Sequence, residues 1–200
     1  MKEYNNYSAV QGPDSFIGIC HLGLVLFGIA AWLTGDAADD YKEYRHIWFT
    51  LHGWIGMGLA SSLILYMIYG TLGPRLSRFS QWVPYTKEGL KMVREDIAGL
   101  LRFRLPDRAG HQGLVGLVQF FGVVVFAGMA VTGALMFFIL EPGSKAGGMI
   151  HAIKEVHEVG EILIPLYLSM HVGAVLLHSI TGHPVWKRIF FFGKGELRSQ

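Results

Sequence analysis

The sequence has little charge and almost no cysteine. Charged residues make up 16% of its 200 residues and hydrophobic residues 52%, whereas an ordinary globular domain is about a quarter charged. Cys20 is the only cysteine, which excludes an intrachain disulfide, a metal site built from cysteine pairs and a C-x-x-C-H attachment motif. The sequence also has no internal repeat, no low-complexity tract and no nucleic-acid-binding motif, so we expect no nucleic-acid partner.

The apolar residues gather in four segments, each long enough to cross a bilayer, which takes about 20 helical residues. These segments are residues 16–34, 47–70, 114–140 and 157–181. None of them has Lys, Arg or Asp in its interior. Because a backbone in lipid must satisfy its own hydrogen bonds, an open sheet is excluded. The sequence therefore predicts an all-α protein, in which residues 1–200 form one integral membrane four-helix bundle surrounded by membrane lipid.

The basic residues outside these segments predict the orientation of the bundle. Residues 71–113 contain eight Lys or Arg, residues 35–46 and 141–156 contain two each, and the tail after residue 181 contains four. Basic residues are concentrated on the cytoplasmic side of membrane proteins. We therefore expect both termini and the long loop 71–113 to face the cytoplasm.

Apolar residues recur at helical spacing within loop 71–113. The residues that share one helical face are Leu90, Val93, Ile97, Leu100 and Leu101. With charged residues on the other faces, this pattern predicts an amphipathic cytoplasmic helix. Such a helix either lies on the membrane surface or packs on its own protein, and the sequence leaves both arrangements open.

Five of the nine histidines lie within the apolar segments, where an ionisable side chain is costly and marks function. His178 lies near the cytoplasmic end of the fourth segment and is set apart, which leaves four candidates. They are His21, His52, His157 and His171. Fourteen residues of helix separate His157 from His171, an advance of about 21 Å that falls about 40° short of four full turns. A proton relay requires shorter steps, and a divalent metal requires clustered ligands. Two separate axial haem ligands fit this spacing, and Pro165 between them can bend the helix.

The predicted topology supplies a partner for each of these two histidines. His21 and His171 both lie toward the cytoplasmic side, whereas His52 and His157 both lie toward the outer side. We therefore predict two haem b groups, one held by His21 and His171 and the other by His52 and His157, through neutral imidazoles. Nearby glycines are expected to let a flat macrocycle approach the backbone: Gly18, Gly53, Gly56, Gly160 and Gly173.

Four stretches, which together cover about residues 14–195, resemble the bacterial cytochrome b-561 family, which includes the b-type cytochrome subunits of nickel-iron hydrogenases. They read "DSFIGICHLGLVLFGIAAWLTG", "LHGWIGMGLASSLILYMIYGTLGPRLSRFSQWVP", "AGHQGLVGL" and "VHEVGEILIPLYLSMHVGAVLLHSITGHPVWKRIFFFGKG". The family's histidine ligands carry over to His21, His52, His157 and His171. The chain departs from the family at Leu22, where tryptophan is usual, and around Tyr66, where an arginine is often found.

The resemblance implies a di-haem cytochrome b of the bacterial cytoplasmic (inner) membrane, which moves electrons between the quinone pool and a redox partner at the outer face. The partner is expected to be a c-type cytochrome or a hydrogenase-like subunit. His111 and Gln112, at the start of the third span, are expected at a quinone site, although His111 fits a helix cap equally well. Arg45 at the outer face and Arg78 at the cytoplasmic face are expected to contact haem propionates.

Two other functions stay open. Some members of the family are self-sufficient enzymes that oxidise superoxide and reduce quinone. Such an enzyme calls for a cationic outer face, whereas loop 35–46 is net acidic and suits a basic c-type cytochrome. The alternative from a different class is a haem-free, histidine-bearing transporter. The sequence also leaves open whether the chain is only an electron-transfer subunit of an oxidoreductase complex or has its own quinone reductase or quinol oxidase activity.

Overall fold

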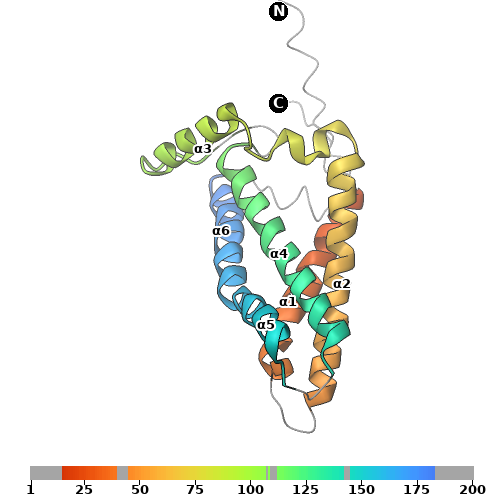
Figure 1. The fold of residues 1–200 in the computed structure, drawn as a ribbon. Coiled ribbons are helices and arrows are strands. Elements are labelled where there is room, and N and C mark those ends of the chain that lie inside the picture. The colour runs from red at the N-terminus through yellow and green to blue at the C-terminus, as the bar shows by residue number, and fades with distance from the viewer. Residues whose placement is uncertain (1–14, 40–44, 107, 109–111, 142–144, 183–200) are drawn as a thin grey trace, which may run out of the picture.

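The computed structural model of the chain describes residues 15–39, 45–106, 108, 112–141 and 145–182. Among these residues every regular element is helical, which confirms the all-α prediction. The elements, in which η marks a short 3-10 helix, are α1 (Ser15–Asp39), α2 (Arg45–Leu72), η2 (Arg75–Ser77), η3 (Phe79–Gln81), α3 (Lys87–Leu100), α4 (Leu114–Ile139), α5 (Gly148–Glu158) and α6 (Gly160–Ile180) (Figure 1).

Four helical stretches of the described residues are long and apolar enough to cross a membrane. They are Ser15–Ala38, Ile47–Leu72, Leu114–Ile139 and Gly148–Ile180, the last of which joins α5 and α6 end to end. Large apolar side chains on these stretches face outward: Leu33, Leu72 and Ile180 are 67%, 78% and 83% exposed. Such exposure is costly in water but is the expected outer surface of a helix bundle in hydrocarbon. The protein is therefore a multi-pass membrane protein, as predicted.

The packing of the spanning helices divides the bundle into two halves. α1 packs mainly on α2, α5 and α6 pack on α4, and the contact between α2 and α4 joins the halves. Figure 1 shows α4 running obliquely, close to α2 at one end and away from it at the end that carries α3. We call the end that carries α3 the α3 end and the opposite end the α5 end. Small residues permit the close contacts, since a Cβ at Gly58 would overlap the Phe27 ring.

The helices at the α5 end are longer than predicted. Residues 141–156 were expected to form a loop, but α5 begins at Gly148. The polar residues of α5 hid this helix, although one pair of them, Lys154 and Glu158, lies four residues apart and forms an ion pair that stabilises helical structure. α1 likewise continues to Asp39, past its predicted end at residue 34.

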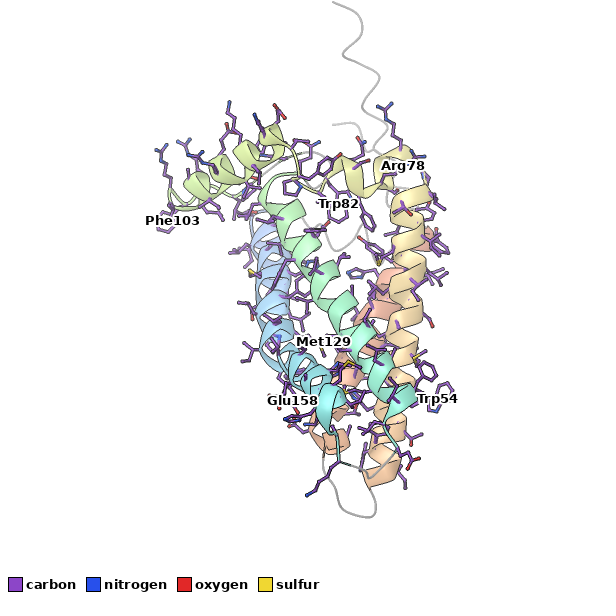
Figure 2. All side chains as sticks on the ribbon, in the orientation of Figure 1. Trp54, Arg78, Trp82, Phe103, Met129 and Glu158 are labelled. Carbon is purple, nitrogen blue, oxygen red and sulfur yellow. The ribbon has the colours of Figure 1, made fainter. Side chains whose placement is uncertain are left out.

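The fourth span is not one continuous helix, because a break at Val159 divides α5 from α6. Gly160 follows the break and lies so close to α4 that a Cβ there would overlap the side chain of Met129, which is labelled in Figure 2. Glycine is a poor helix former, so the break falls where the helix is weakest and where α4 contacts its backbone. Pro165, the bending point expected from the sequence, lies inside α6.

α3 is the predicted amphipathic helix, and it lies outside the four-helix bundle. Figure 1 shows it projecting sideways, across the direction of the spanning helices. Its N-cap is Thr86, whose hydroxyl accepts a hydrogen bond of 3.0 Å from the backbone N–H of Gly89. Val93 and Asp96 are each 6% exposed, which shows that only one side of α3 is buried against the rest of the protein.

A buried carboxylate fixes α3 to the start of α4. Asp96 accepts hydrogen bonds from Arg108 Nε at 2.7 Å and from the backbone N–H of Leu114 at 2.9 Å. The hydrogen bond to Asp96, followed by that to Glu95, raises the pKa of Arg108 above its ordinary value. Gly113, between the two segments, has φ of +70°, and a Cβ there would overlap the Asp96 carboxylate. The junction therefore requires glycine at this position.

Candidate functional site

The four histidines predicted as ligands lie on four different helices. His21 lies on α1, His52 on α2, His157 in the last turn of α5 and His171 in the middle of α6. Because α1 packs mainly on α2, and both α5 and α6 pack on α4, the first two histidines belong to one half of the bundle and the last two to the other.

The histidines face one another in two pairs across the boundary between the halves. The ring centroids of His21 and His171 are 6.2 Å apart, and those of His52 and His157 are also 6.2 Å apart. The ring planes are inclined by 42° in the first pair and by 86° in the second. The structure thus brings together the same partners that the topology predicts, although their role as ligands stays a prediction.

An iron bound between two imidazoles fits these distances. A metal–imidazole bond is about 2 Å long and a ring nitrogen lies about 1 Å from its ring centroid, so two rings that share one metal have centroids about 6 Å apart. Among the described residues, no group of three or more His, Cys, Asp or Glu side chains is arranged to hold a metal ion. Each pair therefore offers two opposed ligands without an equatorial set, which suits haem, because its macrocycle supplies the equatorial nitrogens.

A threonine hydroxyl orients the His157 ring. Thr132 Oγ1 donates its proton to the Gly128 carbonyl at 2.7 Å and lies 2.8 Å from His157 Nδ1. Because the only hydroxyl proton goes to that carbonyl, the hydroxyl oxygen accepts from Nδ1–H. This hydrogen-bond network assigns the Nδ1–H tautomer, which leaves Nε2 with a lone pair for a metal.

His52 has the same arrangement. Thr34 Oγ1 donates to the Ala30 carbonyl at 2.8 Å and lies 3.1 Å from His52 Nδ1. The two histidines at the α5 end are therefore both oriented by threonines that donate to the backbone four residues earlier. Sequence reasoning missed both threonines because such backbone bonds are common in helices. A threonine on the helix packed against each histidine was the only available signal.

The pair at the α3 end has different surroundings. The Tyr167 ring stacks on the His171 ring, with centroids 5.4 Å apart and an interplanar angle of 21°. Tyr167 also contacts the rings of Phe121 and Phe126, with centroid distances of 6.4 and 5.7 Å. Aromatic side chains thus connect His171 to α4, whereas hydroxyl groups adjoin the pair at the α5 end.

The glycines near the histidines divide into two groups. Gly53 and Gly160, which were expected to face a macrocycle, instead lie against side chains of α4. By contrast, Cβ atoms built at Gly56 and Gly173 would meet no atom within 4 Å. Gly56 follows His52 by about one helical turn and therefore lies on the same face of α2. A flat group held by His52 would therefore have room beside Gly56.

Comparison with known proteins identifies the family. A family model described as prokaryotic cytochrome b561 matches residues 14–192, which include all four spans. The chain belongs to this family. Comparisons with curated proteins and with solved structures find no match. Family membership makes the chain a membrane b-type cytochrome that binds haem b and takes part in electron transfer.

This cytochrome has an apolar cleft at the α3 end, where α2 and α4 spread apart. The cleft has a volume of about 320 Å³ and is lined by Met67, Phe79, Ser80, Trp82, Val83, Tyr85, Phe120 and Val123. Gln112, expected at a quinone site, does not line it but donates from Nε2 to the Gln81 carbonyl at 3.3 Å, next to the cleft wall. His111 lies outside the described residues. Sequence reasoning missed the cleft because η3, which forms its roof, has no motif.

Of the two arginines expected to contact haem propionates, the structure describes the side chain of one. Arg78 is exposed in the turn after α2 (Figure 2), and its Nε donates to the Gly73 carbonyl at 2.9 Å. The side chain of Arg45 lies outside the described part of the chain. The contacts of both arginines with propionates stay predictions.

Proposed function

We propose that the chain is a di-haem cytochrome b that transfers electrons across the bacterial inner membrane, between quinone and a redox partner at the outer face. One haem is held by His21 and His171, and the other by His52 and His157. The observation that carries the proposal is the pair of equal 6.2 Å ring separations, each formed between helices of different halves. The basic loop between α2 and α4 assigns the α3 end to the cytoplasm.

The residues of the chain bind and orient the cofactors. Haem iron, when bound, supplies a one-electron couple. Thr34 and Thr132 hold the imidazoles at the α5 end in the Nδ1–H tautomer, which makes their Nε2 atoms better donors. The apolar spans exclude water from both pairs. Hydroxyl groups adjoin one histidine pair and aromatic rings adjoin the other. The two haems would therefore have different reduction potentials.

The cleft at the α3 end supports a quinone site on the cytoplasmic side. Met67 and Phe120, on two spanning helices, are 39% and 41% exposed, so a lipid-soluble ring reaches the cleft from the bilayer. Three of the lining residues, Ser80, Trp82 and Tyr85, carry hydroxyl or indole N–H groups, the kinds of donor that quinone carbonyls accept from. The Tyr85 hydroxyl itself donates to the Ser80 carbonyl at 3.5 Å. The proposed quinone site therefore lies beside the cleft wall next to Gln112 and not at Gln112 itself.

The outer partner is expected to be a basic redox protein. Residues 35–46, at the end of α1 and the start of α2, include four acidic and two basic residues, and complementary charge speeds encounter with a partner of opposite sign. A c-type cytochrome fits this charge, and a hydrogenase-like subunit is the second partner that the family resemblance implies. The same acidity speaks against superoxide as a substrate, because an anion is repelled by it.

Counting haems in double variants tests the ligand pairs. The purified full-length chain should contain two haem b per polypeptide. Replacing both members of one pair, as in His52→Ala/His157→Ala, should leave one haem. Replacing one member of each pair, as in His157→Ala/His171→Ala, should remove both. His151→Ala is a matched control, because His151 is exposed on α5 and pairs with Glu155 at 3.6 Å, and it should keep both haems.

Three results would contradict parts of the proposal. Loss of both haems from the same-pair variant, with helical content unchanged by circular dichroism, would mean that the ligands are paired differently. A wild-type chain without haem would favour the histidine-bearing transporter. If haem is present, reduction of the chain by superoxide faster than by a reduced c-type cytochrome would favour the superoxide:quinone oxidoreductase.

A further inference from the structure

The apolar face of α3 is wider than the surface that the protein covers. Val93 and Asp96 are buried on the side toward α4. Leu90, Ile97 and Leu101 lie together on the neighbouring side and are 53%, 45% and 81% exposed. An amphipathic helix packed only on its own protein would bury this stripe. The stripe formed by Leu90, Ile97 and Leu101 is therefore exposed and available to contact an apolar surface outside the protein.

The turn after α3 exposes a strained aromatic residue. Phe103 has φ of +57° and is 100% exposed. The turn is closed by hydrogen bonds of 2.9 Å from the N–H groups of Phe103 and Arg104 to the Leu100 and Gly99 carbonyls, a helix end at which glycine is usual. A side chain at positive φ is costly, and the full exposure of this ring means that packing against the described residues does not offset the cost.

Basic residues accompany this apolar surface. Arg102 and Arg104 flank Phe103 and are exposed, as are Lys91 and Arg94 along the helix. Figure 2 shows Phe103 at the end of α3 farthest from the bundle. Exposed aromatic residues next to arginine are typical of the boundary between headgroups and acyl chains.

We propose that α3 and the following turn, residues 87–104, anchor the protein to anionic lipids of the leaflet at the α3 end. Leu90, Ile97, Leu101 and Phe103 enter the acyl boundary, and Arg102 and Arg104 bind headgroup phosphates. The membrane is the occupant because α2 ends and α4 begins at this same end, so its surface lies beside α3. An apolar stripe with a basic flank is the pattern of a helix that lies in such an interface.

Spin labelling of the full-length chain in lipid nanodiscs tests the anchor. A label on Phe103→Cys reports its depth by collision with oxygen, which concentrates in hydrocarbon, and with a water-soluble nickel chelate. Cys20 is 4% exposed, so the label attaches to the introduced cysteine. In discs that contain phosphatidylglycerol, we expect the label to be accessible to oxygen and protected from nickel. Glu88→Cys, on the far side of α3 from Leu90, is the matched control and should show the reverse.

Lipid charge separates headgroup binding from simple burial. Phosphatidylcholine discs lack anionic lipid. In these discs the ratio of membrane-inserted α3 to free α3 should fall by about fivefold for each arginine that no longer binds an anionic headgroup. Arg102→Gln/Arg104→Gln should abolish the difference between the two kinds of disc. Phe103→Gly relieves the positive φ and should keep the fold, while a label on Leu101→Cys moves toward water.

Three outcomes would overturn the anchor. If a label on Phe103→Cys is accessible to the nickel chelate in anionic discs, the surface is exposed to water and would instead bind a water-soluble protein. Spin–spin broadening between labels would assign it to a second copy of the chain. Equal depth in both kinds of disc would refute headgroup binding. None of these measurements requires haem, so their failure is independent of the ligand pairs.

Discussion

Replacing Thr132 by valine tests whether its hydroxyl tunes the haem that we propose at the α5 end. The change keeps the shape of the side chain but removes the oxygen that accepts from His157 Nδ1–H at 2.8 Å. A ligand whose Nδ1–H is hydrogen-bonded is more basic and stabilises ferric iron. Losing the acceptor should therefore raise the reduction potential of the haem held by His52 and His157.

The size of the shift follows from the strength of one neutral hydrogen bond. Such a bond contributes about 0.5–1.5 kcal/mol, and the part that differs between the two oxidation states is at most the whole of it. For a one-electron couple, about 59 mV corresponds to a tenfold change in the equilibrium constant. The expected rise is therefore at most about 20 to 60 mV.

A redox titration followed by electron paramagnetic resonance assigns the shift to one haem. The g-anisotropy of low-spin haem grows as the axial imidazole planes become perpendicular, so the pair at 86° should be distinguishable from the pair at 42°. Thr132→Ser, which restores the hydroxyl, should restore the potential. Thr71→Val is the matched control, because its Oγ1 also donates to the carbonyl four residues earlier, at 3.0 Å, but lies at the α3 end.

The titration has a clear negative result. An unchanged potential for the more anisotropic haem, with haem content intact, would mean that the Thr132 hydroxyl does not accept from the ligand. If only the potential of the other haem shifts, Thr132 does not contact the pair formed by His52 and His157. Either outcome would refute the tautomer assigned from the hydrogen-bond network.

Three other variants test the α3 end. Gly113→Ala puts a Cβ at φ +70° against the Asp96 carboxylate and should cost at least about 1–2 kcal/mol, measured as a lower midpoint of thermal unfolding; an unchanged midpoint would contradict the junction. Asp96→Asn removes the charged partner of Arg108 at 2.7 Å and should cost about 1.5–3 kcal/mol, with faster hydrogen exchange at the start of α4 than in wild type. Val123→Trp fills the cleft and should slow haem reduction by quinol at least about tenfold without loss of haem. Val124→Trp, at a position 52% exposed to lipid, should leave that rate unchanged.

The spans could be predicted because each is an uninterrupted apolar segment of bilayer length, and lipid leaves no other backbone structure available. The meeting of the four histidines could be predicted for a related reason. In an up-and-down bundle the position of a residue along its span sets its depth, so His21 and His171 come to one level regardless of side-chain detail. The sequence did not predict which helices pack together in each half of the bundle, and this came from the structure.

The remaining features depend on contacts between residues far apart in the chain. Asp96 joins α3 to α4 across 18 residues, and Thr132 contacts His157 across 25. No local pattern marks either residue, because Asp96 reads as an ordinary charged position and Thr132 as an ordinary helical threonine. The break at Val159 is similar, since it depends on α4 lying against Gly160. The cleft exists only because η3 spans the gap between two diverging helices.

The division of the bundle into halves links the cofactors to the stability of the fold. α2 and α4 provide the main contact between the halves, and these two helices diverge toward the α3 end (Figure 1). Each histidine pair takes one residue from each half, so a group ligated by both rings also joins the halves. The pair of His21 and His171 lies toward the diverging end, where helix contacts hold the halves least. If the proposed pairing is right, a haem bound there would stabilise the folded bundle, because a ligand that binds only the folded state shifts unfolding by mass action.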